Sequence, residues 1–204
     1  SRDSSILPTP SQLGFRMPAE WHPHRRCWMA WPCREATWPN GLDAAREAYA
    51  AVAAAISDFE PVTMVCPPAD VAEASLTLGR GIDVAPLAID DSWIRDSGPT
   101  FLIDGKGGLA VADWRFNAWG GNYPDHDRDA TLAARIADRL GLHRFEAPIV
   151  LEGGAVHVDG EGAPTGFLGV IAMPFVADGQ RKRAAICGSL LVAERESDPF
   201  AGAK

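Results

Sequence analysis

An internal repeat constrains the fold of this 204-residue chain more than any other feature of its sequence. Two stretches carry the same order of elements: a helix, a strand, a glycine-containing loop with a carboxylate, and a hairpin that turns at Asp-Gly-x-Gly. The first copy is expected to comprise helix 69–78, strand 82–89, loop 90–99, strand 100–103, the turn 104–107 and strand 109–114. The second is expected to comprise helix 129–140, strands 143–147 and 149–151, loop 152–154, strand 155–158 and the turn 159–162. This order predicts an α/β fold made of repeated modules.

One carboxylate stands at an equivalent place in each copy. Asp96 lies eight residues before Asp104, and Glu152 lies seven before Asp159. Modules arranged around an axis would point both acids at one ligand. Two converging carboxylates suit a planar cation such as a guanidinium, because each accepts paired N–H bonds. A structural alternative is open at this point, in which Asp96 pairs with Arg95 and Glu152 caps the end of a strand.

Composition narrows the class of partner. The chain has 27 Asp and Glu against 19 Lys and Arg, a net charge of −8, and no basic stripe. Nucleic acid and anionic membrane surfaces are therefore poor partners, whereas the negative electrostatic field of the protein favours a cationic small molecule. No run of 18 apolar residues occurs, and the first residues lack the apolar core of a secretory signal. We expect no membrane association and a cytoplasmic location.

The segment before the repeat contains a cluster of tryptophans. Residues 1–14, with two prolines and several hydroxyl residues, are expected to form a flexible lead-in. Four of the seven tryptophans follow between 21 and 38, a density typical of packed core or of an aromatic-walled pocket. Apolar residues at three- and four-residue steps then predict a helix over 42–57, and a buried strand is expected over 61–66.

Several motifs, taken in order, resemble the agmatine deiminase family, which also contains bacterial-type peptidylarginine deiminases. They are Met17-Pro18-Ala19-Glu20-Trp21 with His24, Trp28-Met29-Ala30-Trp31-Pro32, Asp91-Ser92-Trp93-Ile94-Arg95-Asp96-Ser97-Gly98-Pro99, Phe116-Asn117-Ala118-Trp119-Gly120-Gly121, and Glu152-Gly153-Gly154 with Asp159-Gly160-Glu161-Gly162. The resemblance covers roughly residues 15–162. It implies a pentein-type α/β propeller of about five ββαβ modules, of which 15–162 would form an incomplete set.

The resemblance also implies an activity. Enzymes of this family hydrolyse a guanidine such as agmatine to a ureido product, N-carbamoylputrescine, and ammonia, without a metal or organic cofactor. A cysteine thiolate attacks the guanidinium carbon, and a histidine acts as general acid and base. Asp96 matches the guanidinium-binding aspartate and Glu152 the active-site glutamate, our two catalytic candidates. Trp93 and Trp119 match motif tryptophans that would wall the substrate site, with core packing as the alternative.

The family pattern stops after Gly162. Residues 163–204 contain neither the Gly-His-x-Asp motif nor a cysteine in the family's nucleophile context, and form a divergent tail. His157 imitates the His-x-Asp motif, but it aligns with Leu102 of the first copy. Cys187 lacks the histidine expected before the nucleophile. The remaining cysteines stand among structural motifs: Cys27, Cys33 and Cys66.

We therefore expect both the catalytic histidine and the catalytic cysteine to be absent from this chain. A frameshift or premature stop, an error of gene prediction, and true divergence would each account for the tail. The alternatives for function are a deiminase-like hydrolase involved in putrescine synthesis, a peptidylarginine deiminase, and an inactive fragment that binds a cationic guanidine or a partner chain. Homo-oligomerisation stays open.

A metal site is not expected. His22, His24 and Cys27 lie close together in sequence, but no fourth ligand accompanies them and no Cys-x-x-Cys pair occurs.

Overall fold

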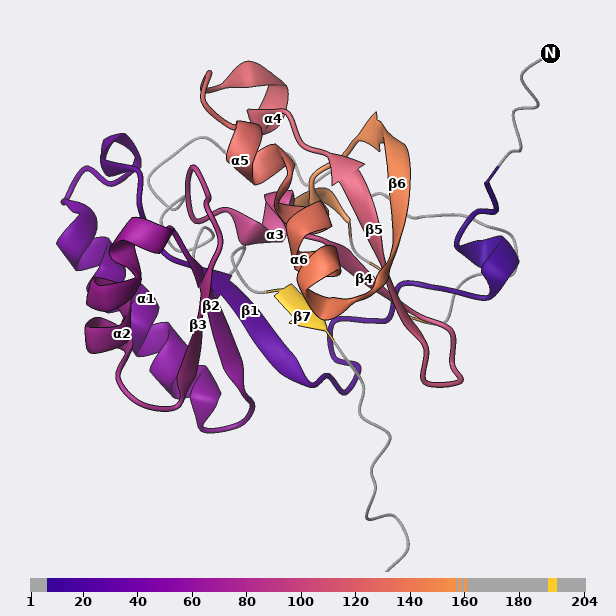
Figure 1. The fold of residues 1–204 in the computed structure, drawn as a ribbon, viewed down its shortest axis with the longest axis horizontal. Helices are drawn as coiled ribbons and strands as arrows, with labels where there is room; N and C mark the ends of the chain where they lie inside the picture. The colour runs from indigo at the N-terminus through magenta and orange to yellow at the C-terminus, as the bar shows by residue number, and fades with distance from the viewer. Residues whose placement is uncertain (1–6, 157, 159, 161–190, 194–204) are drawn as a thin grey trace, which may run out of the picture.

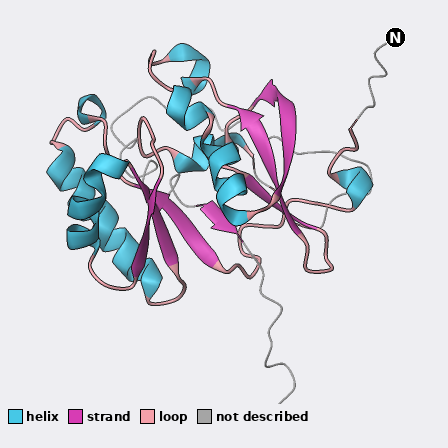
Figure 2. Cartoon of the chain, in the orientation of Figure 1, coloured by secondary structure: helices cyan, strands magenta, loops and turns pink. Residues whose placement is uncertain are grey.

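The structure is a computed structural model that describes residues 7–156, 158, 160 and 191–193 (Figure 1). Two sheets lie side by side, with helices on the outer face of the first sheet and between the two sheets (Figure 2). The first part of the chain forms β1 Arg26–Ala30, α1 Leu42–Ser57, β2 Val62–Cys66, α2 Val71–Leu78 and β3 Ile82–Pro86. The second forms α3 Ile94–Ser97, β4 Thr100–Ile103, β5 Leu109–Arg115, α4 Ala118–Gly121, α5 Asp127–Ala130, α6 Leu132–Leu140 and β6 His143–Val150, and β7 is Leu191–Ala193.

The first sheet has the strand order β3-β2-β1-β7. β1 and β3 run parallel to β2, with α1 and α2 as crossovers, and β7 pairs antiparallel with β1. Alternate residues of β1 enter different cores. Cys27 and Met29 pack with residues of α1 and α2, whereas Trp28 and Ala30 pack with residues of α6. Because helices cover both faces, β1 and β2 are buried along nearly their whole length, without the alternation of buried and exposed residues seen in strands that face solvent.

The second sheet has the order β4-β5-β6. β4 and β5 form an antiparallel hairpin, and α6 carries the chain from β5 to the parallel strand β6. Together β4, β5, α6 and β6 make one ββαβ unit of the kind that the resemblance implies. The described residues contain this unit and an α/β first sheet, and they show no closed propeller.

The predicted helices differ from the observed ones mainly at their ends. The helix over 42–57 is confirmed as α1. The helix predicted over 129–140 is divided, because Thr131 turns its hydroxyl onto the carbonyls of Asp127 and Arg128 at 3.1 and 3.2 Å. α6 ends as expected at Gly141, whose φ of 65° is left-handed.

The strand predicted over 155–158 is wrong for the residues that the structure describes. Gly153–Ala155 forms a 3-10 turn, η4, in which the N–H of Ala155 donates to the carbonyl of Glu152 and that of Val156 to the carbonyl of Gly153. These N–H groups are used locally and are not free for a ladder. The two strands predicted over 143–151 form the single strand β6. His157 and most of the turn 159–162 lie outside the described residues.

Two of the four tryptophans in the N-terminal cluster belong to the core. Trp28 and Trp31 are 2% and 0% exposed, whereas Trp21 is 69% exposed. Packed core therefore explains two of them without a pocket. Among the described helices, none combines the length and the apolar character needed to span a membrane.

Candidate functional site

Asp96 lies on the one-turn helix α3 and is fixed at both carboxylate oxygens. Its Oδ1 accepts the backbone N–H of Gly154 at 2.8 Å, and its Oδ2 accepts the indole N–H of Trp119 at 3.2 Å. Burial raises the pKa of Asp96 above its usual value, and the negative charge of Glu152 adds to this, whereas the two hydrogen bonds and Arg95 oppose it. The loops that carry Asp96 and Glu152 therefore meet, although 58 positions separate Asp96 from Gly154.

Two glycines allow this close approach. Neither Gly153 nor Gly154 has a positive φ, so backbone conformation alone does not require glycine at either position. A Cβ atom at Gly153 would come within 3.0 Å of the backbone oxygen of Arg95, and one at Gly154 within 3.0 Å of Asp96 Oδ1. Such distances are not tolerated, so the Gly-Gly pair after Glu152 brings η4 against α3.

Trp93 and Trp119 form part of a continuous aromatic wall beside Asp96. Its members are Trp38, Trp93, Phe116, Trp119 and Tyr123. The rings of Trp93 and Trp119 meet edge to face at 5.4 Å between centroids, and Trp93 stacks on Trp38 at 6.4 Å. Trp119 also meets Phe116 and Tyr123 edge to face. Trp93 and Trp119 are half-buried, so they combine core contacts with some exposed surface.

A left-handed turn places Trp119. All four residues of α4 have positive φ, and two of them, Ala118 at 53° and Trp119 at 54°, are not glycine. Asn117 caps the turn by accepting the N–H of Gly120 at 2.9 Å. Side chains other than glycine adopt this conformation at a cost of about 1–2 kcal/mol per residue. Despite this cost, the turn places the indole N–H of Trp119 within hydrogen-bond distance of Asp96.

Sequence reasoning missed Asp91, which holds Trp93. Asp91 is 0% exposed, and its Oδ2 accepts the indole N–H of Trp93 at 2.9 Å and the hydroxyl of Thr37 at 2.7 Å. The sequence offers one indication of this role, because the acidic pair Asp90-Asp91 directly follows an apolar strand. Acids at such a position are usually solvated, so the pair alone does not predict a buried carboxylate. Both indole N–H groups of Trp93 and Trp119 therefore donate to carboxylates.

The N-terminal motif braces the same region. Glu20 forms an ion pair with Arg95, the residue before Asp96. Arg16 donates to the carbonyl of Gly160, and a Cβ atom at Gly160 would collide with Ala19. Residues 16–20 thus fasten α3 to the segment after η4.

The cysteines that the structure describes are not activated nucleophiles. Burial raises the pKa of the Cys27 and Cys66 thiols to about 12. The pKa of Cys33 is also raised, by burial first and then by nearby carboxylates, including Asp91 and Asp129. A reactive cysteine needs a lowered pKa, so none of these three thiols meets that requirement. Cys187 lies outside the described residues.

Comparisons with known proteins agree on one group of enzymes. The family model for Porphyromonas-type peptidyl-arginine deiminase matches residues 16–165. The agmatine deiminase of Pseudomonas aeruginosa is 48% identical over 165 residues, which cover 78% of this chain and 45% of that protein. That of Stutzerimonas stutzeri is 47% identical over 167 residues, covering 78% and 45%.

Solved structures give the same result. The agmatine deiminase of Enterococcus faecalis superposes with a TM-score of 0.74 at 38% identity, over 77% of this chain and 44% of that one. The chain thus spans less than half the length of the curated relatives it matches.

Proposed function

Because the chain belongs to the Porphyromonas-type peptidyl-arginine deiminase family, we propose that it supplies the guanidinium-binding part of an agmatine deiminase active site. The observation that carries this proposal is the meeting of Asp96 and the Glu152 loop beside an aromatic wall. The family model and the similar enzymes confirm the family resemblance found in the sequence, whereas the roles of individual residues are part of the proposal.

Each residue has a distinct task in this proposal. Asp96 accepts one N–H at each oxygen, and every carboxylate oxygen has a second lone pair for a guanidinium N–H. Glu152 adds a second negative charge on the facing loop. Trp93 and Trp119 are half-buried aromatic rings, and the faces of such rings favour a cation over a neutral ligand. Together they bind and orient the guanidinium so that its carbon is fixed for attack.

The chemical step needs a nucleophile that the described residues do not supply. In the proposed reaction a cysteine thiolate adds to the guanidinium carbon, the C–N bond breaks, and ammonia leaves with a proton from a general acid. Water then adds to the thiouronium carbon and returns one proton to the group that acted as general acid. The C–S bond breaks, the second proton of the water passes to solvent, and the ureido product and the thiolate are released. Cys27, Cys33 and Cys66 all have raised pKa values, so we assign none of them to this step.

The fold supports a wider proposal about architecture. The ββαβ unit of β4, β5, α6 and β6 has the connectivity of a propeller module. We place residues 15–162 in an incomplete set of such modules, in line with the share of the relatives' length that the chain spans.

Calorimetry with agmatine tests the binding role on the 204-residue chain. Wild type should bind agmatine, and Asp96→Asn should lose at least about 30-fold in affinity, because removing one charge of a buried pair leaves its partner uncompensated. Asp58→Asn is the matched control: it changes net charge equally at an exposed residue after α1. Far-UV circular dichroism checks that all variants fold.

Two results would refute the proposal: no heat with wild type, or equal affinities for wild type and Asp96→Asn. Benzoyl-arginine amide, titrated in parallel, decides the substrate class. Tighter binding of this peptidyl-arginine mimic than of agmatine would replace agmatine deiminase by peptidylarginine deiminase as the assigned activity.

A further inference from the structure

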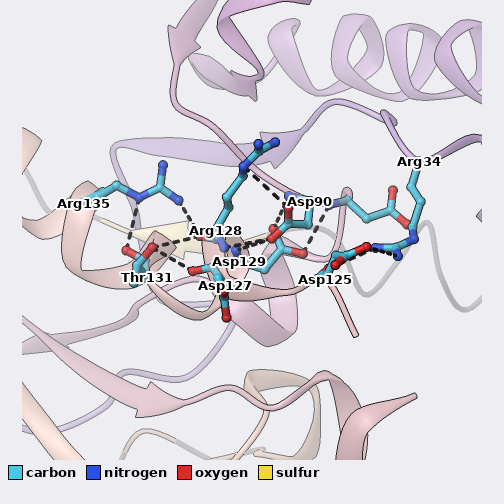
Figure 3. A network of polar contacts seen from close by, with 9 residues as sticks. Arg34, Asp90, Asp125, Asp127, Arg128, Asp129, Thr131 and Arg135 are labelled. Atoms are coloured by element: carbon cyan, nitrogen blue, oxygen red, sulfur yellow. Dashed lines mark hydrogen bonds and ion pairs between the residues drawn. The ribbon is translucent and has the colours of Figure 1, made fainter. Parts of the chain in front are cut away.

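The loop between β3 and α3 is joined to α5 by two aspartates in a reciprocal arrangement. Asp129 accepts the backbone N–H of Asp90 at its Oδ1, at 2.8 Å, and that of Asp91 at its Oδ2, at 3.2 Å. Asp90 in return accepts the backbone N–H groups of Arg128 and Asp129, at 2.8 and 3.3 Å, on its Oδ2. Figure 3 shows Asp90 and Asp129 side by side, with Arg128 reaching over Asp90. We call Asp90 and Asp129 the aspartate clamp.

Asp129 occupies an unfavourable place for a carboxylate. It is 0% exposed, and Asp90 and Asp91 bring two further negative charges close to it. Burial and these charges raise its pKa to about 7, against the hydrogen bonds from Asp90 and Asp91. The positive charge of Arg135 interacts electrostatically with Asp129, although the Arg135 guanidinium donates to the backbone carbonyls of Arg128 and Thr131. A neutral apolar residue at position 129 would avoid the cost of burying a carboxylate. A carboxylate at this position is therefore expected to perform a task that an apolar side chain cannot.

The clamp fixes the backbone from which the site is built. The N–H groups held by Asp129 belong to Asp90 and Asp91, and the side chain of Asp91 accepts the indole N–H of Trp93. Trp93 meets Trp119 edge to face, and Trp119 donates to Asp96. A continuous chain of contacts therefore runs from Asp129 to Asp96, although Asp129 contacts neither Trp93 nor Asp96 in any hydrogen bond that the structure records.

We propose that Asp129 is a positioning residue for the guanidinium site, whose two oxygens set the backbone of residues 90–91 and so the placement of Trp93 and Asp96. The link to ligand affinity rests on the proposed function of the site. The link to the backbone of residues 90–91 does not, and it can be tested without a ligand.

The two members of the clamp differ in what an amide could replace. Asp90 uses one oxygen for both N–H groups, and an asparagine carbonyl can do the same. Asp129 uses one oxygen for each N–H group, so asparagine would present its NH2 group to one of the two donors. Asp129→Asn should therefore break the clamp, whereas Asp90→Asn should largely preserve it, although each variant removes one negative charge.

Amide hydrogen exchange measured residue by residue on the 204-residue chain at about pH 8, where the Asp129 carboxylate is ionised, tests the backbone link. In Asp129→Asn, at least one of the amides of Asp90 and Asp91 should exchange about 10-fold faster or more, the effect of losing a hydrogen bond to a charged acceptor. Asp90→Asn should leave both rates within about 3-fold of wild type. Asp127→Asn, an exposed acid in the same turn of α5, is the control for charge.

Agmatine titration of the same variants tests the link to the site. We expect an affinity about 10-fold weaker for Asp129→Asn, with Asp90→Asn and Asp127→Asn close to wild type. Faster exchange confined to α5 and α6, with 90–91 unchanged, would show a merely structural role and overturn the proposal. Faster exchange at 90–91 with unchanged affinity would overturn its link to the site. If wild type fails to bind agmatine, the proposed function fails, and the exchange rates still decide whether Asp129 holds this loop.

Discussion

Replacing Gly153 by alanine should damage the fold more than any other single methyl group added near the site. The new Cβ atom would meet the backbone oxygen of Arg95 at a distance that falls about 1 Å short of the closest contact that real Cβ atoms make. Arg95 lies within α3, and its carbonyl cannot rotate away as a side chain can. Either α3 or η4 must therefore move.

The cost follows from overpacking. Extra methyl groups in well-packed interiors cost typically about 1–3 kcal/mol, and a backbone-to-backbone collision belongs at the upper end. We expect Gly153→Ala to lose about 3 kcal/mol of unfolding free energy. With a urea slope of about 2 kcal/mol per molar, the unfolding midpoint would fall by about 1.5 M.

Two further glycines provide the comparison. Gly154→Ala places its methyl group against Asp96 Oδ1, the end of a side chain, so it should cost less stability and yet weaken agmatine binding. Gly105→Ala has open space but a φ of 73°, and should cost about 1 kcal/mol through backbone strain alone. Urea unfolding followed by tryptophan fluorescence measures all three. A cost for Gly153→Ala equal to or below that for Gly105→Ala would show that close approach does not explain the Gly-Gly pair.

Two other predictions concern titration. Trp119→Phe keeps a ring in the aromatic wall but removes the N–H donor to Asp96, so stability should change by less than about 1 kcal/mol while the pKa of Asp96 rises. As pH is lowered, the Trp119→Phe variant should then lose its affinity for agmatine at a higher pH than wild type does. Coincident pH profiles of affinity for the two proteins would contradict this. Burial above all raises the pKa of Asp129 from 3.8 to about 7, so the folded chain keeps a proton that the unfolded chain releases between about pH 4 and 7. The stability due to this group therefore falls as pH rises through that window, by on the order of 4 kcal/mol in total. In urea unfolding, Asp129→Asn should gain relative to wild type as pH rises, and a difference independent of pH would refute it.

Patterns of short range predicted much of this architecture. The apolar spacing of 42–57 predicted α1 with its observed bounds, because one helix face packs against the first sheet. Comparison of the two repeat copies pointed to two acidic loops facing one ligand, and the loops of Asp96 and Glu152 do meet. Their catalytic roles stay predictions.

Features that depend on contacts between distant segments were not predicted. The buried contacts of Asp91 and Asp129 were not predicted, because sequence alone does not reveal which donors lie beside them. Asp91 accepts the indole N–H of Trp93, and Asp129 accepts backbone N–H groups of the loop that contains Asp91. The left-handed turn at Trp119 was also not predicted. Gly120-Gly121 is its only indication in the sequence, since tertiary contacts hold the non-glycine residues in place. A strand over 155–158 was expected by analogy with the first copy, but Ala155 and Val156 use their N–H groups in the local hydrogen bonds of η4.

The hydrogen bond between Gly154 and Asp96 has a consequence for how the chain folds. Closing a loop of 58 residues costs about 4 kcal/mol of chain entropy, more than a single hydrogen bond returns. The contact therefore forms only after the hairpin of β4 and β5 and the crossover through α6 have brought the segments together. The same order runs in reverse when the chain opens, so η4 can detach from α3 while both sheets stay intact. The proposed binding site can therefore be lost while the folded state persists.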